Sequence, residues 1–247
     1  MAKMDISLYQ KSAVSHLDRL IKSNHKVMEK LARQIVQDVR KKKSLLIFGS
    51  GHSGLFPLEL YHRAGGASFV LPLVADHLLP TAGPPVVRIL ERTPGAATML
   101  LDRYSARKGE MLWLASQSGI NSAAIDLAIE AKKRGLTTVA FTSLVHSQAV
   151  KSRHPSGMRL FEVCDETVDL GGFVGDASVD LKTGVSAGPL SNLGAVFLGH
   201  SILVAACKVL ETSGVRCVYT SVNTPDGEKR NRKLERVACK RDFLLRG

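Results

Sequence analysis

The sequence predicts an α/β protein with a mainly parallel sheet that helices cover on both faces. From Ser44 onward, short continuous apolar runs alternate with helical patterns, as expected for parallel strands buried on both sides. The 247 residues suffice for one full core, and 45% hydrophobic with 23% charged residues is ordinary for a globular protein. We therefore expect one domain over 44–225, preceded by amphipathic helices in 1–43 that pack on it or on a partner subunit. A basic segment, 226–247, follows.

The elements follow from periodicity and from breaks in it. Apolar residues between 5 and 40 recur about every 3.6 residues, which predicts one or two amphipathic helices. Candidate strands lie at 44–49, 68–74, 110–115, 136–142, 166–170 and, less regularly, 215–220. Candidate helices lie at 53–64, 94–105, 120–134 and 190–212. The glycine- and proline-containing stretches 81–86 and 171–189 are expected to be long irregular loops, which are commonly functional.

The net charge of +12 is confined to the two ends of the chain. Residues 1–43 hold eleven Lys and Arg against four Asp and Glu, and 228–247 hold eight against three. The middle of the chain has equal numbers of both signs, so the excess is expected on solvated helical surface. The ends could steer an anionic ligand if they met near a site. They lack interleaved aromatic residues, which argues against binding of nucleic acid.

Several classes of protein are disfavoured by what the sequence lacks. No apolar run approaches the roughly 18 residues of a membrane span, and the first residues lack the apolar core of a signal peptide, so we expect a cytoplasmic protein. The four cysteines (Cys164, Cys207, Cys217 and Cys239) show no C-x-x-C spacing and are expected to be reduced. The eight histidines show no H-x-x-x-H or H-E-x-x-H spacing, so we expect no metal and no cofactor.

Two hydroxyl-rich turns follow two of the apolar runs, in LLIFGSGHSG (45–54) and LWLASQSGIN (112–121). Their glycines allow close backbone approach to a ligand, and both turns open helices, whose N-termini favour anions. In a doubly wound sheet both turns emerge at the carboxyl ends of the strands. Neither a Walker A loop nor a dinucleotide fingerprint fits them, so we expect neutral donors for a phosphate monoester without a metal. The expected donors are Ser50, Gly51, Ser53, Ser116, Gln117, Ser118 and Asn121.

The pairing of GSGHS with SQSG resembles the sugar isomerase (SIS) domain. The stretches FGSGHSGLFPLELYHRAGG, ASQSGINSAAIDLAIEAKKRGL, FTSLVHS and GFVGDASVDL resemble a bacterial subfamily of stand-alone SIS proteins, related to phosphoheptose isomerase and N-acetylmuramic acid 6-phosphate etherase. The resemblance implies a flavodoxin-like three-layer α/β/α sandwich with a five-stranded sheet, a homodimer or higher homo-oligomer, and a sugar phosphate ligand. It makes Ser53, Ser116, Gln117 and Ser118 the phosphate contacts. Ser143, in the stretch FTSLVHS, is a further candidate contact for the phosphate or the sugar. Asn121 stands where many relatives have threonine.

Enzymes of this kind remove a proton next to a carbonyl, usually at sugar carbon 2, which requires a general base. Glu59 is the best candidate, because relatives carry a catalytic glutamate on the corresponding helix. The alternative is an ion pair with Arg63 four residues later. His52, inside the first turn, is the candidate proton shuttle or phosphate donor.

Three further residues have both a functional and a structural interpretation. His77 either faces the sugar or forms a turn pair with Asp76. Asp176 either binds sugar hydroxyls or acts as a turn or N-cap residue. His200 is expected to be a core histidine rather than a catalytic one.

These observations predict an enzyme that abstracts the carbon-2 proton of a hexose or amino-sugar 6-phosphate. The outcome is aldose–ketose isomerisation, or elimination of water or an ether group, and the sequence does not choose between them. The alternative is a phosphosugar sensor without catalysis. In an oligomer the late stretch VNTPDGEKRN, with Asn223, Asp226 and Glu228, could complete a neighbouring site.

Overall fold

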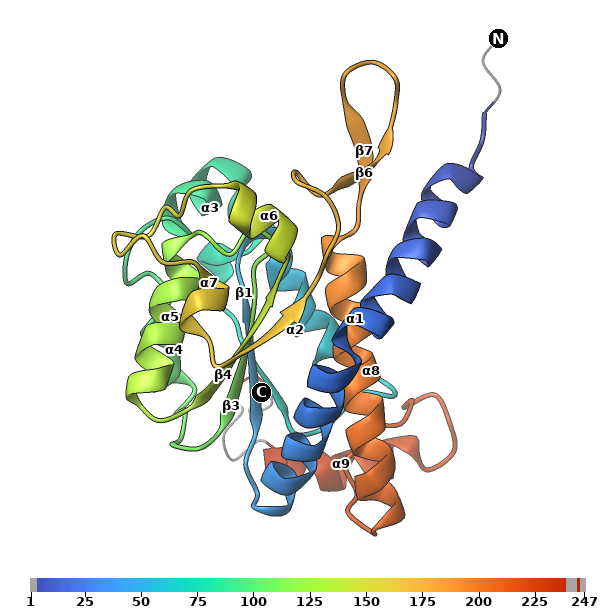
Figure 1. Ribbon diagram of the computed structural model, residues 1–247. Helices are drawn as coiled ribbons and strands as arrows, with labels where there is room; N and C mark the ends of the chain where they lie inside the picture. The colour runs from blue at the N-terminus through green and yellow to red at the C-terminus, as the bar shows by residue number, and fades with distance from the viewer. Residues whose placement is uncertain (1–3, 239–243, 245–247) are drawn as a thin grey trace.

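The centre of the computed structural model is a five-stranded sheet in the order β2-β1-β3-β4-β5, in which every pairing is parallel (Figure 1). The structure describes residues 4–238 and 244. The strands of the sheet are β1 (Leu45–Gly49), β2 (Val70–Leu73), β3 (Met111–Ala115), β4 (Thr137–Thr142) and β5 (Glu166–Asp169). The predicted fold class, a five-stranded parallel α/β sandwich with a helical lead-in, is confirmed.

Helices cover both faces of this sheet (Figure 1). On one face lie α1 (Ser7–Arg40), α2 (Leu55–Leu60) and α8 (Ser191–Thr212). On the other lie α4 (Leu100–Arg103), α5 (Ser122–Lys133) and α7 (Leu160–Val163). The remaining helices are α3 (Pro84–Leu90), α6 (Leu144–Ala149), α9 (Gly227–Ala238) and the 3₁₀ turns η1 (Gly51–Gly54), η2 (Asp76–Leu78) and η3 (Pro80–Ala82).

The core has two halves because successive strand side chains point to opposite faces. In β1, Leu45 and Ile47 pack toward α1 and α8, whereas Leu46 and Phe48 pack toward α5. The half under α2 and α8 contains an aromatic cluster, in which the Trp113 ring lies 4.9 Å from that of Phe141. The fully buried strands explain why the apolar runs were continuous rather than alternating.

Helix α8 is the one helix in the described part of the chain that is both long and apolar enough to cross a membrane. This holds by length and composition only, and half of its most apolar window is buried in the protein. Core helices of soluble proteins pass the same test, and α8 packs along α1 and α2. Its Gly199 allows this close approach, since a Cβ there would lie 2.8 Å from Phe56 Cε2.

Several expected elements differ in the structure. The stretch 215–220 forms no strand; it meets the chain at 65–68 through a single antiparallel bridge between Ala67 and Val218. The expected helix at 94–105 shrinks to α4, because turns around Gly95, whose φ is 77°, occupy its first half. The expected helix at 53–64 is η1 followed by α2, ending at Leu60.

The expected loop 171–189 contains an antiparallel hairpin, β6 (Ala177–Asp180) and β7 (Ser186–Pro189). It projects from the top of the molecule in Figure 1, beside the first turns of α1. The Tyr9 hydroxyl of α1 donates to the Pro189 carbonyl at 2.7 Å. A Cβ on Gly188 would lie 2.6 Å from the Tyr9 ring, so the hairpin base and α1 are closely packed.

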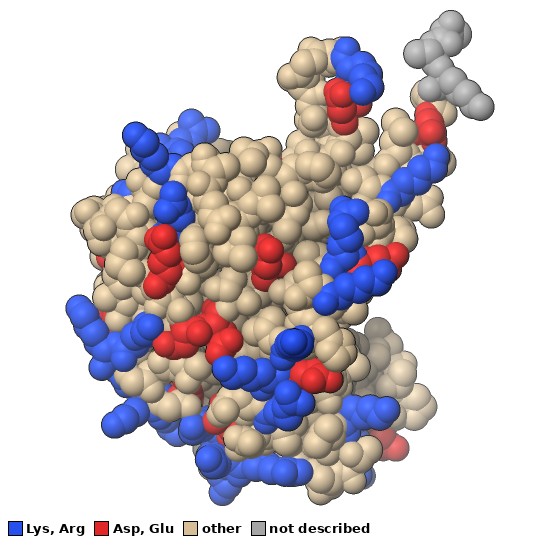
Figure 2. All heavy atoms as spheres, in the orientation of Figure 1, with Lys and Arg blue, Asp and Glu red and all other residues tan. Residues whose placement is uncertain are grey.

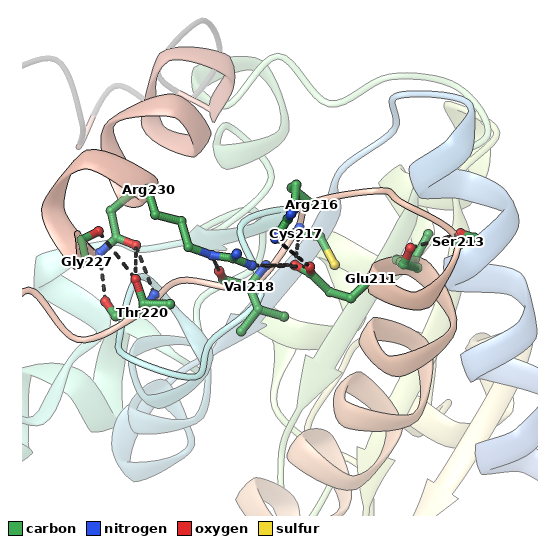
Figure 3. Close-up of polar contacts among 10 residues, drawn as sticks. Glu211, Ser213, Arg216, Cys217, Val218, Thr220, Gly227 and Arg230 are labelled. Carbon is green, nitrogen blue, oxygen red and sulfur yellow. Dashed lines mark hydrogen bonds and ion pairs between the residues drawn. The ribbon is translucent and has the colours of Figure 1, made fainter. Parts of the chain in front are cut away.

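The basic C-terminal segment begins with α9, which lies at the opposite end of the molecule from the hairpin (Figure 1). Glu211, near the end of α8, holds this region together (Figure 3). Its carboxylate accepts from Cys217 N at 2.8 Å, Val218 N at 3.0 Å and Arg230 Nη2 at 3.0 Å. Cys239 and the rest of the predicted basic segment, 239–243 and 245–247, lie outside the described residues.

Lys and Arg side chains are scattered over the face shown in Figure 2, with Asp and Glu among them. Many of them pair, as in the Lys43–Asp38 bridge at 3.0 Å. Since α9 lies far from the edge of the sheet that holds the two glycine-rich turns, its charge does not gather at those turns. Cys164, Cys207 and Cys217 are free thiols.

Candidate functional site

A pocket of about 660 Å³ opens at the carboxyl ends of β1 and β3. Both hydroxyl-rich turns line it. The first contributes Ser50, Gly51, His52 and Ser53, and the second contributes Ser116, Gln117, Ser118 and Asn121. The structure therefore brings together the residues that the two turns were predicted to present. Helix α3 and the base of the hairpin complete the walls.

The first turn is shaped by glycine. After β1 the chain folds back so tightly that a Cβ on Gly49 would lie 2.1 Å from the Ser53 carbonyl oxygen. Gly51 has φ 57°, a left-handed conformation that side chains disfavour. The 3₁₀ turn η1 then leads directly into α2, so the first backbone N–H groups of η1, in residues that line the pocket, have no partner within the helix.

The second turn also depends on a glycine. Gly119 has φ 60°, and its N–H donates to Ser116 Oγ at 3.2 Å. The Gln117 carbonyl accepts from Ser143 N at 3.0 Å, which fixes the turn against the end of β4. Gln117 Oε1 is buried and has no hydrogen-bond partner in the described structure. Buried polar atoms of this kind are uncommon, so the side-chain amide of Gln117 has capacity left for a ligand.

Helix α3 brings cations to the pocket. Arg88, on α3, and Arg92, two residues beyond the end of α3, both line it. Neither forms an ion pair within 4 Å among the described residues, although the charge of Arg92 acts on the neighbouring Glu91. Both guanidiniums can therefore meet an anion. The sequence reasoning missed them because 81–86 was interpreted as a loop. The signal was available in Pro84 and Pro85, since proline favours the first turn of a helix.

Glu91, the residue after α3, is the second feature that sequence reasoning missed. Its carboxylate lies between the two turns: Asn121 Nδ2 donates to Oε1 at 2.9 Å, and a Cβ on Gly51 would lie 3.3 Å from Oε2. Burial raises the pKa of Glu91, and the Arg92 and Arg153 guanidiniums offset that effect only in part. A half-buried carboxyl with a raised pKa inside a pocket is typical of an acid–base residue.

Asp176 lines the pocket at the base of the hairpin, but its carboxylate is occupied. It accepts from Leu190 N at 3.1 Å, Ser191 N at 2.9 Å and Ser191 Oγ at 2.6 Å. These bonds correspond to the turn and N-cap interpretation, at the start of α8. His146, on α6, also lines the pocket and belongs to the FTSLVHS stretch, although the sequence reasoning did not single it out.

Three predicted site residues lie outside the residues that line the pocket. Glu59 pairs with Arg63 and lies 3.9 Å from His200 Nε2, on the α2–α8 side, because six residues of helix turn it away from Ser53. His77, in η2, is exposed. Ser143 is buried, and its hydroxyl caps α6 by accepting from His146 N at 3.1 Å.

The described residues contain no group of three or more His, Cys, Asp or Glu side chains placed to hold a metal ion. The pocket instead presents hydroxyls, amides, backbone N–H groups, guanidiniums and one carboxyl free of strong ion pairing. Such a donor set suits an anion that also carries hydroxyl groups.

Comparison with known proteins agrees with this architecture. Residues 8–143 match the SIS domain family. The chain is 34% identical over 232 residues to a UPF0309 protein of Shouchella clausii, covering 93% of this chain and 94% of the relative. A UPF0309 protein of Oceanobacillus iheyensis is 33% identical over 230 residues, covering 92% of this chain and 93% of the relative. The chain therefore belongs to the SIS domain family and, within it, is similar to the UPF0309 proteins.

Solved structures share the fold at low sequence identity. A phosphoheptose isomerase from Francisella tularensis superposes with a TM-score of 0.56 at 13% identity, covering 84% of this chain and 100% of that one. A phosphoheptose isomerase from Neisseria gonorrhoeae gives a TM-score of 0.54 at 14% identity, covering 84% of this chain and 97% of that one. At these identities the likeness establishes the fold.

Proposed function

We propose that the protein binds a sugar phosphate in the pocket at the carboxyl ends of β1 and β3. The single observation that carries this proposal is the convergence of two hydroxyl-rich turns with Arg88 and Arg92 in one pocket. Hydroxyls and turn N–H groups suit phosphate oxygens, and guanidiniums add charge. The two phosphoheptose isomerases that share the fold support the same ligand class.

We further propose an enzyme rather than a sensor. The reaction is abstraction of the carbon-2 proton of a hexose or amino-sugar 6-phosphate, leading to isomerisation or elimination. Support comes from the half-buried Glu91 carboxyl, whose pKa is raised by burial, and from the presence of His52 in the same pocket, since proton abstraction requires a general base and a group that moves protons between oxygens. The expected phosphate contacts are Ser53, Ser116, Gln117 and Ser118.

The test incubates the pure protein in heavy water with glucose 6-phosphate, glucosamine 6-phosphate and fructose 6-phosphate, and follows exchange of carbon-bound protons by NMR. Exchange with at least one substrate supports the enzyme. Binding in a calorimetric titration without exchange would support a sensor. Ser118→Ala should weaken binding about tenfold by removing one hydroxyl hydrogen bond to a charged group.

The protein is also proposed to form a homodimer or higher homo-oligomer in the cytoplasm. Along α8 the apolar residues Leu193, Val204 and Val209 remain exposed, and Val204 is 62% accessible. An unpaired apolar helix face of this kind is typical of subunit contacts. Light scattering after gel filtration should show an oligomer that Val204→Glu weakens; a monomer before substitution would contradict the proposal.

A further inference from the structure

We propose that Glu91 is the catalytic residue that moves the proton in this pocket, and that Asn121 is the positioning residue that holds it. The inference rests on the proposed sugar phosphate chemistry and assigns its acid–base group. It replaces Glu59, the residue that the sequence favoured, with a residue 32 positions later at the end of a helix that the sequence did not indicate.

Glu91 is better placed for proton transfer than the other candidate carboxylates, those of Asp176 and Glu59. Two carboxylates line the pocket, those of Glu91 and Asp176. Asp176 accepts three hydrogen bonds at the start of α8, so protonation would break contacts that anchor the hairpin. Glu59 lies on the α2–α8 side in its ion pair with Arg63. Among the described carboxylates that line the pocket, Glu91 is the less tightly bonded, because its hydrogen-bond donors are two side chains, those of Asn121 and Ser50.

The placement of Glu91 also fits. Its backbone carbonyl accepts from Ala123 N at 3.0 Å, which ties the end of α3 to the first turn of α5. Its Oε1 accepts from Asn121, while Oε2 faces Gly51. The carboxyl therefore lies between the two turns that are proposed to bind the phosphate, in reach of a sugar held by them.

Asn121 is oriented by a second contact. Arg153 Nη1 donates to Asn121 Oδ1 at 3.1 Å, which leaves Nδ2 as the donor toward Glu91. The hydrogen bonds from Arg153 to Asn121 and from Asn121 to Glu91 thus orient the carboxyl. The oxygen and the nitrogen of the Asn121 side-chain amide both form hydrogen bonds, to Arg153 and to Glu91. Asn121 therefore acts through Glu91 rather than as the direct sugar contact expected from sequence.

The proton transfer balances without any co-reactant. The Glu91 carboxylate takes the proton from carbon 2 of an aldose phosphate, and the electron pair of that C–H bond forms the carbon 1–carbon 2 double bond as the carbonyl oxygen becomes an enolate oxygen. Glu91 then returns a proton to carbon 1, while the proton on oxygen 2 passes to oxygen 1. The product is the ketose isomer, and nothing is oxidised or reduced overall.

The protonation state suits this role. Burial raises the pKa of Glu91, and the charged neighbours that oppose the rise are Arg92 beside it and Arg153 behind Asn121. Arg88, His52 and His146 are the other titratable or charged groups around the pocket, apart from Asp176. A base with a raised pKa holds a proton transiently and exchanges it with solvent, which is the event that NMR detects.

The test compares three variants in heavy water, using whichever of the named hexose phosphates the parent protein exchanges. Glu91→Gln should lower the exchange rate about 10²–10⁴-fold, the usual contribution of general acid–base catalysis, while its calorimetric affinity for the substrate stays within about threefold. Glu59→Gln tests the rival carboxylate. Glu130→Gln, which changes a carboxylate paired with Arg134 on α5, is the matched control for substitution itself.

The outcomes separate the two proposals. Exchange by the parent that persists in Glu91→Gln, or that is lost in Glu59→Gln instead, would overturn the assignment and leave the enzyme proposal standing. Absence of exchange in the parent defeats the enzyme proposal and the assignment together. Circular dichroism and the retained affinity show whether Glu91→Gln is folded.

Asn121→Ala tests the positioning role through the pH–rate profile, whose midpoint would not change if Asn121 were only structural. Its amide hydrogen bond lowers the pKa of Glu91, so losing it should shift the acidic limb of the pH–rate profile to higher pH. An unchanged midpoint, whatever the rate, would contradict the positioning role.

Discussion

Glu91 and Glu211 are both partly buried glutamates, yet the protein treats them in opposite ways. Ser191, at the start of α8, lines the pocket beside Glu91, whereas Glu211 lies 20 residues further along the same helix, about 30 Å away. Burial alone would raise the pKa of Glu211. Its carboxylate accepts hydrogen bonds from two backbone amides and from Arg230, and together these bring the pKa below its ordinary value. The pKa of Glu91 lies above the ordinary value for a glutamate.

The difference teaches how to separate a structural carboxylate from a functional one. At the α9 end the ionised carboxylate is fully matched by donors, and its charge stabilises the fold (Figure 3). At the pocket end the donors are fewer, and Gln117 Oε1 nearby has no partner among the described residues. This oxygen belongs to a residue that lines the pocket, so it is available to a ligand there.

The largest expected effect contrasts glycines at the two ends. Gly49→Ala places a Cβ 2.1 Å from the backbone oxygen of Ser53, which cannot move away cheaply, so we expect a loss of about 3 kcal/mol or more. Gly214→Ala at the end of α8 meets no atom within 4 Å and incurs only the left-handed strain of φ 84°, about 1 kcal/mol. Urea denaturation measures both; equal losses would contradict the view that the first turn is sterically locked.

The next effect contrasts the carboxylates themselves. Glu211→Gln removes charge-assisted hydrogen bonds and leaves Arg230 unmatched, so we expect a loss of about 2 kcal/mol in the free energy of unfolding. Glu91→Gln should change stability by less than about 0.5 kcal/mol, because no strong pairing is lost. Thermal unfolding of the two variants decides, and greater destabilisation by Glu91→Gln would reverse the comparison.

The smallest expected effect is the pH dependence of the stability changes caused by Glu211→Gln and Glu91→Gln. The two changes should vary with pH in opposite directions. Glu211 has a lowered pKa, so its contribution is present above the ordinary glutamate pKa of about 4.3 and is lost as pH falls through its folded pKa. Glu91 has a raised pKa, so its contribution is present below about 4.3 and is lost as pH rises through its folded pKa. As the pH is lowered from 7 to 3, Glu211→Gln should become less destabilising relative to the parent, with the change below about pH 4.3, whereas Glu91→Gln should become more destabilising, with the change above about pH 4.3. Parallel trends in denaturation curves would refute the assigned pKa directions.

The central strands were predictable from sequence because they are buried on both faces and stand out as apolar runs, as in 110–115 against the observed Met111–Ala115. The edge strand β5, with the sequence ETVD, is only partly buried. The two turns were predictable because glycine and serine clustered at the end of such an apolar run are typical of a turn. Helix α3 was not, because its prolines were interpreted as loop residues.

Glu91 was beyond sequence reasoning for a physical reason. Its environment is created by Asn121 and Gly51, which lie 30 and 40 residues away along the chain and meet it in the folded structure. Glu59 follows the first turn directly in the sequence, which favoured it as the base. Helical geometry instead directs its side chain toward Arg63 and His200. Local pattern specifies elements, whereas the surroundings of a carboxylate depend on tertiary structure.

The hairpin of β6 and β7 has an evolutionary consequence. Its base supplies Asp176 and Pro189 to the pocket wall, yet its two strands pair only with each other and not with the central sheet. Insertions or exchanges in this segment can therefore reshape one wall of the pocket while the sheet and both turns stay intact. Descendants of one ancestral scaffold could diverge in the ligands they select by altering this appendage alone.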